Sequence, residues 1–421
     1  MMHYSYSNSQ LLCEAAAITT IAAALPTPFY LYSRKTYLEN YESIAAAFRN
    51  RPHRICYALK ANSNLDILRD FAARGAGADV VSVGELKLAL RAGIPASAIV
   101  FAGVGKRDDE IIAGLEADIR GLNVESEAEL EVINDLARQR GVIARVALRV
   151  NPNIDIHGHP YISTGRSADK FGIELERVRS LMREVREFKH LKLAGLHSHI
   201  GSLITELAPY AEVGKVMARL AHQAIALGHE LDYLDVGGGL GVIYENAIAV
   251  ASNTEPVEGL ALSPNNVAEQ LMRPMADLKC DLIFEPGRAL VATCGALVTR
   301  VLYIKHSGGK RFVVVDASMS DLIRPSLYNA HHQIVPVHLQ RREREKCEIV
   351  GPVCESGDFF AKERELEKVE RGELLAIMTA GAYGYSLSSN YNARPRPAEV
   401  IVEGKSYKIS RPRQEVERVW E

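Results

Sequence analysis

A single lysine ends an apolar stretch in "ICYALKAN", residues 55–62. A lysine ammonium in a mainly apolar pocket loses proton affinity, because burial penalises the charged form. The neutral amine attacks carbonyl carbons and can hold a Schiff base. Cys56 and Ala58 are small and share one side of the strand with Lys60, which leaves room for a bulky cofactor. Lys60 therefore indicates carbonyl chemistry, with a solvated lysine at a strand end as the simpler alternative.

A glutamate ends another apolar stretch, where "CDLIF" runs into "EPGRALV" at residue 285. A carboxylate at the end of a buried strand needs a cationic partner. The protonated nitrogen of a pyridine ring would serve, and Glu285 would then keep that ring a strong electron sink. Arg288 follows three residues later and can bind a phosphate or a carboxylate through two parallel hydrogen bonds.

Two histidines in "HSHIGS", residues 197–202, allow two interpretations. His197 and His199 lie two positions apart on a predicted strand, and such a pair can bind a metal, with Asp235 as a candidate further ligand. Alternatively, one imidazole stacks on an aromatic cofactor while Ser202 binds its phosphate. We favour stacking and predict no metal, because a lysine and a carboxylate suited to pyridine chemistry occur elsewhere in the chain.

Three successive glycines occur in "DVGGGLG", residues 235–241. Glycines after a strand let backbone N–H groups approach an anion closely. The spacing does not match the dinucleotide-binding pattern GxGxxG, and no helical pattern follows it, so a Rossmann site is disfavoured. A tight turn without a ligand is the simpler alternative.

Strand-like and helix-like stretches alternate over residues 36–289, which favours parallel strands joined by crossover helices. Roughly eight such units in about 250 residues is the size of a (β/α)8 barrel, in which functional groups gather at the C-terminal ends of the strands. The following residues then share one mouth of the barrel: Lys60, Asp79, His197, His199, Gly239 and Glu285. From about residue 290, strand patterns follow one another without long helices, which is typical of an antiparallel sheet or a small β-barrel.

Length and composition indicate a globular protein of two domains. The chain has 421 residues, 47% hydrophobic and 24% charged, with a net charge of -2, so no basic excess suggests nucleic acid or an anionic membrane. The apolar stretch at 14–25 is too short to span a bilayer, and we expect a short helix there. None of the six cysteines forms a CxxC pair, which fits reduced thiols in the cytoplasm.

Four motifs in this order resemble the fold-type III pyridoxal-phosphate decarboxylases: "YALKAN" (57–62), "HIGS" (199–202), "GGGLG" (237–241) and "EPGR" (285–288). That family joins an alanine-racemase-like barrel to an all-β domain that includes the N-terminal strand. The resemblance runs from about residue 26 to about 400. It implies a cofactor-binding barrel at 36–289 and a β domain made of 1–35 and 290–421.

Further segments are similar to those of the diaminopimelate decarboxylases within that family. They are "NPNIDIHGHPYISTGRSADKFGI" (151–173), "RPSLYNAHH" (324–332), "GPVCESGD" (351–358) and "GAYGYSLSSNYNARPRPAEV" (381–400). The resemblance implies decarboxylation of meso-2,6-diaminopimelate to L-lysine and CO2, the last step of lysine biosynthesis, with pyridoxal 5'-phosphate as cofactor.

The resemblance also implies roles for single residues in cofactor binding. Lys60 holds the cofactor as a Schiff base, His199 stacks on its ring and Glu285 pairs with the pyridine nitrogen. The residues near the phosphate or the substrate are Ser202, Gly239, Gly287 and Arg288.

For the substrate, Arg324 and Tyr328 are implied to hold the distal carboxylate and Glu355 the distal ammonium. Tyr383 contacts both cofactor and substrate. Cys354 is the implied proton donor, reaching in from a partner subunit, so the resemblance implies a homodimer with shared active sites.

Four alternatives remain. The first is an arginine, ornithine or carboxynorspermidine decarboxylase of the same fold, whose substrates lack the distal carboxylate beside the amine, so Arg324 together with Glu355 argues against it. A racemase would place a neutral group, not Glu285, at the ring nitrogen. A non-catalytic carrier of pyridoxal phosphate is usually a bare barrel, whereas this chain has a second domain. A metal-dependent barrel hydrolase would use the two histidines as ligands.

Overall fold

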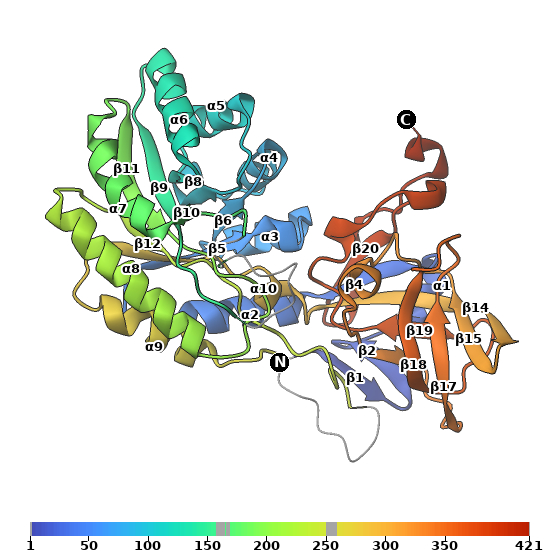
Figure 1. Cartoon of the computed structure of the whole chain (residues 1–421). Coiled ribbons are helices and arrows are strands. Elements are labelled where there is room, and N and C mark those ends of the chain that lie inside the picture. The colour runs from blue at the N-terminus through green and yellow to red at the C-terminus, as the bar shows by residue number, and fades with distance from the viewer. Residues whose placement is uncertain (1, 157–164, 166–168, 250–258, 421) are drawn as a thin grey trace. The chain divides into compact units, whose positions relative to one another are not determined.

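The computed structural model describes residues 2–156, 165, 169–249 and 259–420, which form two compact units (Figure 1). Unit 1 consists of Met1–Asn40, Val242–Gly259 and Arg288–Glu421, and unit 2 consists of Tyr41–Gly241 and Leu260–Gly287. The domain limits inferred from the sequence stay predictions, because compactness does not test independent folding.

Unit 2 contains the predicted (β/α)8 barrel, which is confirmed. Its strands follow the order β9-β11-β12-β13-β5-β6-β7-β8, each pair is parallel, and β8 pairs with β9 to close the sheet. A short strand, β10 (Ile173–Glu174), pairs in parallel with the end of β9. The barrel strands are β5 (His53–Ala58), β6 (Gly77–Val80), β7 (Ile99–Phe101), β8 (Gly121–Val124), β9 (Ala144–Asn151), β11 (Leu191–His197), β12 (Tyr233–Asp235) and β13 (Asp281–Phe284).

Helices follow most of these strands, and a capping side chain begins α3 (Leu65–Ala72), α4 (Val83–Arg91) and α6 (Glu127–Arg140), namely Asn64, Ser82 and Ser126. In α6, the Ser126 hydroxyl accepts from Glu129 N–H at the start, and Gly141 ends the helix in a left-handed conformation. The other helices are α5 (Asp108–Glu116), α7 (Leu175–Glu184), α8 (Ala208–Ala226) and α9 (Pro264–Met272). The barrel interior is filled by a buried cluster: Cys56, Val100, Ala147, Ala194, Tyr233 and Ile283.

Unit 1 is built on a second sheet, with the order β18-β17-β15-β14-β4-β20-β21, and β19 pairs with both β14 and β16. The N-terminal strand β4 belongs to this sheet, as the family resemblance implied, and lies between β14 and β20. The sheet is mixed rather than antiparallel throughout, because β4 pairs with β20 and β15 with β17 in parallel. Its strands are β4 (Phe29–Ser33), β14 (Gly295–Ser307), β15 (Lys310–Val315), β16 (Ile334–Pro336), β17 (Arg344–Val350), β18 (Phe359–Glu367), β19 (Leu374–Ile377), β20 (Ala398–Glu403) and β21 (Ser406–Arg411).

Two segments of unit 1 differ from simple expectation. The apolar stretch at 14–25 contains the expected helix, α1 (Ile18–Ala24), but Ala16–Ala17 form strand β3 of a small sheet with β1 (Tyr4–Ser7) and β2 (Gln10–Cys13). Residues 362–371 form a charged run for which the sequence indicates a solvated face and no strand. Residues 362–367 belong to β18, and Lys362, Glu363 and Glu365 are exposed on it, so only the strand was unexpected. Among the described residues, no helix is long and apolar enough to cross a membrane.

A buried carboxyl group in unit 1 predicts a pH-dependent stability. Asp321 is 4% exposed and accepts hydrogen bonds from Ser318 N–H and Oγ at 2.8 and 3.0 Å. Burial raises the pKa of Asp321 to about 6. The folded state therefore holds this proton up to a higher pH than the unfolded state, so stability falls as pH rises from about 4 to about 6.

Asn at this position stays neutral and can still accept from Ser318. We expect Asp321→Asn to gain about 2 to 3 kcal/mol relative to wild type between pH 4 and pH 7. Urea unfolding of both proteins at pH 4, 5, 6 and 7 checks this. A stability difference that does not change with pH contradicts it.

Candidate active site

Lys60 lies just past the end of β5, in a short 3-10 turn at Leu59–Ala61. Its Nζ donates to Asp79 Oδ2 at 2.7 Å, and Asp79 lies opposite Ala58 on the neighbouring strand β6. The Lys60 side chain is 38% exposed, whereas Asp79 is buried. The sequence suggested a mainly apolar pocket for this lysine. The structure instead gives it one carboxylate partner and an open side, so the amine is both oriented and accessible.

Glu285 follows β13 directly and is buried beside two other titratable groups. His197 Nε2 lies 3.3 Å from Glu285 Oε2 and is placed to donate to it. Oε1 of Glu285 and Oδ2 of Asp235 are buried without a hydrogen-bond partner among the described atoms. His197, Asp235 and Glu285 each offer one ligand atom, and these three atoms lie within 4.8 Å of one another, as the metal alternative requires. A pyridinium N–H requires only one of these carboxylates.

Electrostatics separate the two carboxyl groups. Burial alone would raise the pKa of Glu285, but the nearby His197 lowers it below the usual range. Burial and the charge of Glu285 raise the pKa of Asp235 well above its ordinary value. Glu285 is therefore the ionised member of the pair and Asp235 the protonated one. Once protonated, Asp235 shares a side-chain hydrogen bond with Glu285, and the ionised, buried carboxylate of Glu285 suits a cationic N–H donor.

His199 lies two residues past β11, and its ring is neutral. Burial lowers the pKa of His199 well below its usual value, and the charges of Lys60 and Arg149 lower it further. Gly238 N–H donates to Nδ1 at 3.2 Å, so Nδ1 is the acceptor nitrogen. This hydrogen bond fixes the tautomer and the ring orientation, and a neutral, fixed imidazole can stack on an aromatic ring.

The glycine run after β12 is required by close backbone packing. A Cβ at Gly238 would lie 2.0 Å from the Glu285 carbonyl oxygen, and one at Gly239 would lie 2.4 Å from that of Gly201. Gly239 also has φ +88°, a conformation that other residues rarely adopt. In the described residues 242–249, directly after this run, there is no helix. The glycines therefore bring the ends of β11, β12 and β13 together, which is a structural role alongside any anion binding.

A cluster of two arginines and two tyrosines lies in unit 1. Arg288 begins α10 (Arg288–Val291), and its Nη1 donates to the Tyr244 hydroxyl at 2.6 Å. The Arg288 guanidinium lies 4.7 Å from the centre of the Tyr383 ring, and that of Arg324 lies 4.5 Å from the centre of the Tyr244 ring. Both arginines are buried. Buried guanidinium groups suit anionic ligands such as carboxylates.

Tyr383 has φ +55°, which is unusual for a bulky residue and is typical of sites where function holds the backbone in place. Tyr328 ends α11 (Arg324–Tyr328), one turn of helix from Arg324. Among the predicted substrate residues of unit 1, Arg288 therefore contacts Tyr383. Arg324 and Tyr328 lie on the same short helix, α11.

Cys354 and Glu355 lie in an exposed loop between β17 and β18. The buried Asp358 holds this loop, because its carboxylate accepts from Val353 N–H at 2.7 Å and from Met319 N–H at 2.6 Å. Cys354 N–H in turn donates to Asn392 Oδ1 at 3.1 Å. A well-anchored loop thus presents a thiol and a carboxylate to the outside of unit 1.

The predicted residues fall into both units. Unit 2 carries Lys60, Asp79, His199, Ser202, Gly239, Glu285 and Gly287, and unit 1 carries Arg288, Arg324, Tyr328, Cys354, Glu355 and Tyr383. The predicted loop at 151–173 lies largely outside the described residues, at 157–164 and 166–168. Sequence reasoning missed Tyr244, His332 and Asp358, since each acts on another functional group and none interrupts an apolar pattern.

Comparison with known proteins agrees with this geometry. Residues 35–292 match the family described as pyridoxal-dependent decarboxylase, pyridoxal binding domain. The diaminopimelate decarboxylase of Aquifex aeolicus is 41% identical, over 100% of this chain and 97% of the relative.

Solved structures agree over nearly the whole chain. The crystal structure of diaminopimelate decarboxylase from Helicobacter pylori complexed with L-lysine has a TM-score of 0.89 and 41% identity, and covers 96% of this chain and 98% of its own. The M. jannaschii enzyme in complex with L-lysine has a TM-score of 0.91 and 35% identity, over 100% and 98%. Full-length similarity of this extent leaves one conclusion: the chain belongs to the diaminopimelate decarboxylase family of pyridoxal-dependent decarboxylases.

Proposed function

We propose that this protein decarboxylates meso-2,6-diaminopimelate to L-lysine and CO2, the last step of lysine biosynthesis, with pyridoxal 5'-phosphate as cofactor. The observation that carries the proposal is the full-length similarity, at 41% identity, to a diaminopimelate decarboxylase. It covers the cofactor-binding residues of unit 2 and the arginines and the thiol of unit 1 alike.

The residues of unit 2 fit pyridoxal phosphate. The buried, ionised carboxylate of Glu285 suits a protonated pyridine nitrogen, and the accessible Nζ of Lys60 suits an aldehyde. Bound pyridoxal phosphate supplies an electron sink for the electron pair that a departing CO2 leaves behind. Lys60 would hold the cofactor covalently, with Asp79 orienting its amine. His199 would pack on the ring, and Ser202, Gly239 and Gly287 would bind the phosphate.

Unit 1 supplies the groups for the substrate. Arg324 and Tyr328 bind the carboxylate that stays on the product, Glu355 binds the neighbouring ammonium, and Arg288 and Tyr383 complete the binding site. Interactions far from the reacting carbon orient the departing carboxylate, and such remote binding energy raises the rate of the chemical step. The Cys354 thiol then delivers a proton to the carbon that has lost CO2.

We further propose a homodimer with shared sites, in which Cys354 and Glu355 serve the partner subunit. Their exposure on an anchored loop of unit 1 supports this. The cysteines of the described residues are all free thiols, which fits a reducing compartment, and we infer a cytoplasmic location.

Mixing two inactive variants tests the shared sites. A heterodimer of Lys60→Ala and Cys354→Ala carries one intact site, so random mixing restores about a quarter of wild-type activity. The matched control mixes Lys60→Ala with Glu285→Gln, whose lesions lie in the same unit, and stays inactive. Lysine formation after co-refolding measures both mixtures. An inactive first mixture argues against shared sites.

The first experiment for the activity is a spectrum followed by a lysine assay. The purified protein, supplied with pyridoxal phosphate, should show a visible absorption band that borohydride fixes onto Lys60, and meso-diaminopimelate should yield lysine. A band without lysine would redirect the search to arginine, ornithine and carboxynorspermidine. No band would return His197, Asp235 and Glu285 to the metal alternative.

A further inference from the structure

Arg324 is a buried cation without an acidic partner. It is 2% exposed, and among the described residues of unit 1 it forms no ion pair with a carboxylate, while its Nε has no hydrogen-bond partner. Its neighbours are uncharged in their ordinary forms: the face of the Tyr244 ring and the imidazole of His332. A buried cation of this kind is costly until an anion reaches it. Its orientation is therefore set by Tyr244 and His332 before any ligand arrives.

Two contacts determine the tautomer of His332. Its Nδ1 lies 2.8 Å from the Met378 carbonyl oxygen, which can only accept, so Nδ1 carries the hydrogen. Its Nε2 lies 2.8 Å from Arg324 Nη1, which can only donate, so Nε2 accepts. Burial and the charge of Arg324 lower the pKa of His332 well below its usual range, which keeps the ring neutral. The imidazole thus links the Arg324 guanidinium to the backbone at the end of β19.

Tyr244 connects this pair to Arg288. Its hydroxyl accepts from Arg288, its ring face lies against Arg324, and its ring meets that of His332 edge-on, with centres 5.2 Å apart and planes at 79°. Burial by itself would raise the pKa of Tyr244, but the two arginine charges lower it. One aromatic ring therefore fixes the relative position of two guanidinium groups.

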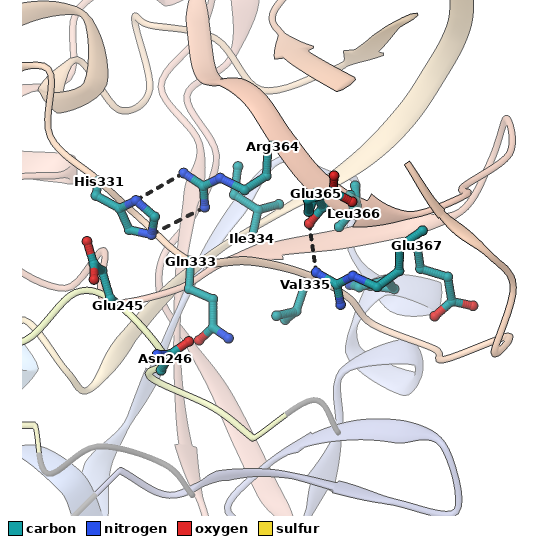
Figure 2. A pocket seen from close by; sticks show the side chains of 12 residues that line it. Glu245, Asn246, His331, Gln333, Ile334, Val335, Arg364, Glu365, Leu366 and Glu367 are labelled. Carbon is teal, nitrogen blue, oxygen red and sulfur yellow. Dashed lines mark hydrogen bonds between the residues drawn. The ribbon is translucent and has the colours of Figure 1, made fainter. Parts of the chain in front are cut away.

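The neighbouring His331 offers a matched comparison. Its side chain lines a cavity of about 260 Å³, where its ring contacts Arg364 (Figure 2). The two histidines are adjacent in sequence but contact different arginines. His332 contacts the buried Arg324, and His331 contacts Arg364.

We propose that His332 and Tyr244 are positioning residues that hold Arg324 with its Nε edge available to the carboxylate retained on the product. This inference rests on the proposed function. It implies that selectivity for substrates with this carboxylate depends on His332 and Tyr244 as well as on Arg324. Neither residue touches the reacting carbon in this role, so their effect is on discrimination between ligands.

The test compares two competitive inhibitors of the enzyme loaded with pyridoxal phosphate. L-lysine has the carboxylate in question, and cadaverine is the same molecule without it. His332→Asn retains an amide N–H near Met378 but does not reach Arg324, whereas His332→Gln places its amide oxygen near the position of Nε2. We expect His332→Asn to weaken lysine inhibition about tenfold and to leave cadaverine within about twofold, because one charge-assisted contact is lost.

His332→Gln and the control His331→Asn should keep the wild-type ratio of the two inhibition constants. Equal effects of His332→Asn on lysine and cadaverine would show a merely structural role and overturn the proposal, as would no effect at all. If the wild-type protein neither forms lysine nor is inhibited by it, the proposed function fails instead, and this inference falls with it.

A second pair of variants addresses Tyr244. Tyr244→Phe keeps the ring face under Arg324, and Tyr244→Leu removes it. The lysine-to-cadaverine ratio should survive in the Phe variant and fall several-fold in the Leu variant, because the cation–π contact between the ring face and the buried Arg324 guanidinium is lost. Equal ratios in both variants would contradict the role assigned to the ring.

Discussion

Replacing Lys60 by alanine is expected to lower kcat for lysine formation by at least about 10³-fold, because the covalent attachment of the cofactor is lost. The structure supports this expectation: the amine is held at 2.7 Å by Asp79 and is still 38% exposed, so it is oriented and within reach of an aldehyde. The absorption spectrum of the purified variant should lack the band that borohydride fixes. Added methylamine should restore part of the activity by supplying a small amine.

The matched control is Lys215→Ala, which removes an exposed lysine that contacts Glu212 on α8. It should keep both the band and the rate. A Lys60→Ala protein that retains the fixable band, or more than about a tenth of wild-type kcat, would assign the attachment to another residue.

The second large effect is expected for Glu285→Gln. The wild-type carboxylate is buried and ionised, held by His197, with one oxygen unpartnered among the described atoms. An amide in that place cannot keep a ring nitrogen protonated, so the electron sink is weakened. We expect kcat to fall by about 10²- to 10³-fold while the cofactor stays attached, comparable to the loss of one preorganised electrostatic contact.

Steady-state kinetics together with the absorption spectrum separate this effect from simple cofactor loss. Glu110→Gln serves as the control, since Glu110 is also buried in unit 2 but accepts from the backbone N–H groups of Val83 and Arg107 and pairs with the Arg107 guanidinium at 3.6 Å. A rate for Glu285→Gln within about threefold of wild type would mean that the ring nitrogen does not depend on this carboxylate.

Much of the fold could be predicted because the helix-like and the strand-like hydrophobic patterns are both regular along the sequence. The barrel strands are short apolar runs, and α6 shows both a serine cap and a terminal glycine. Strand β18 was harder, since its charged residues outnumber the apolar ones that anchor it. The parallel pairing of β4 with β20 was also hidden, because it joins strands from opposite ends of the chain and no local pattern records such a contact.

The candidate site shows a similar division. Lys60 and Glu285 were found because a charged residue at the end of an apolar run is conspicuous. Arg324 could be identified only because the segment 324–332 resembles that of the diaminopimelate decarboxylases. A single arginine has no local sequence signature. His332 and Tyr244 were missed because their role comes from their contacts with Arg324 and Arg288 in the folded protein. The spacing of residues along the sequence does not show such contacts.

The pairing of β5 with β13 in the barrel has a consequence for how the protein is synthesised. These paired strands come from opposite ends of unit 2, so a ribosome must finish nearly all of the intervening chain before Glu285 can reach the strand that carries Lys60. Pairings so distant in sequence form slowly, because a large loop has to be closed first. During most of translation the nascent chain therefore lacks a complete cofactor-binding site. Pyridoxal phosphate then stabilises barrels that have already folded, because a ligand that binds only the folded state shifts the equilibrium towards it. It does not guide the folding itself.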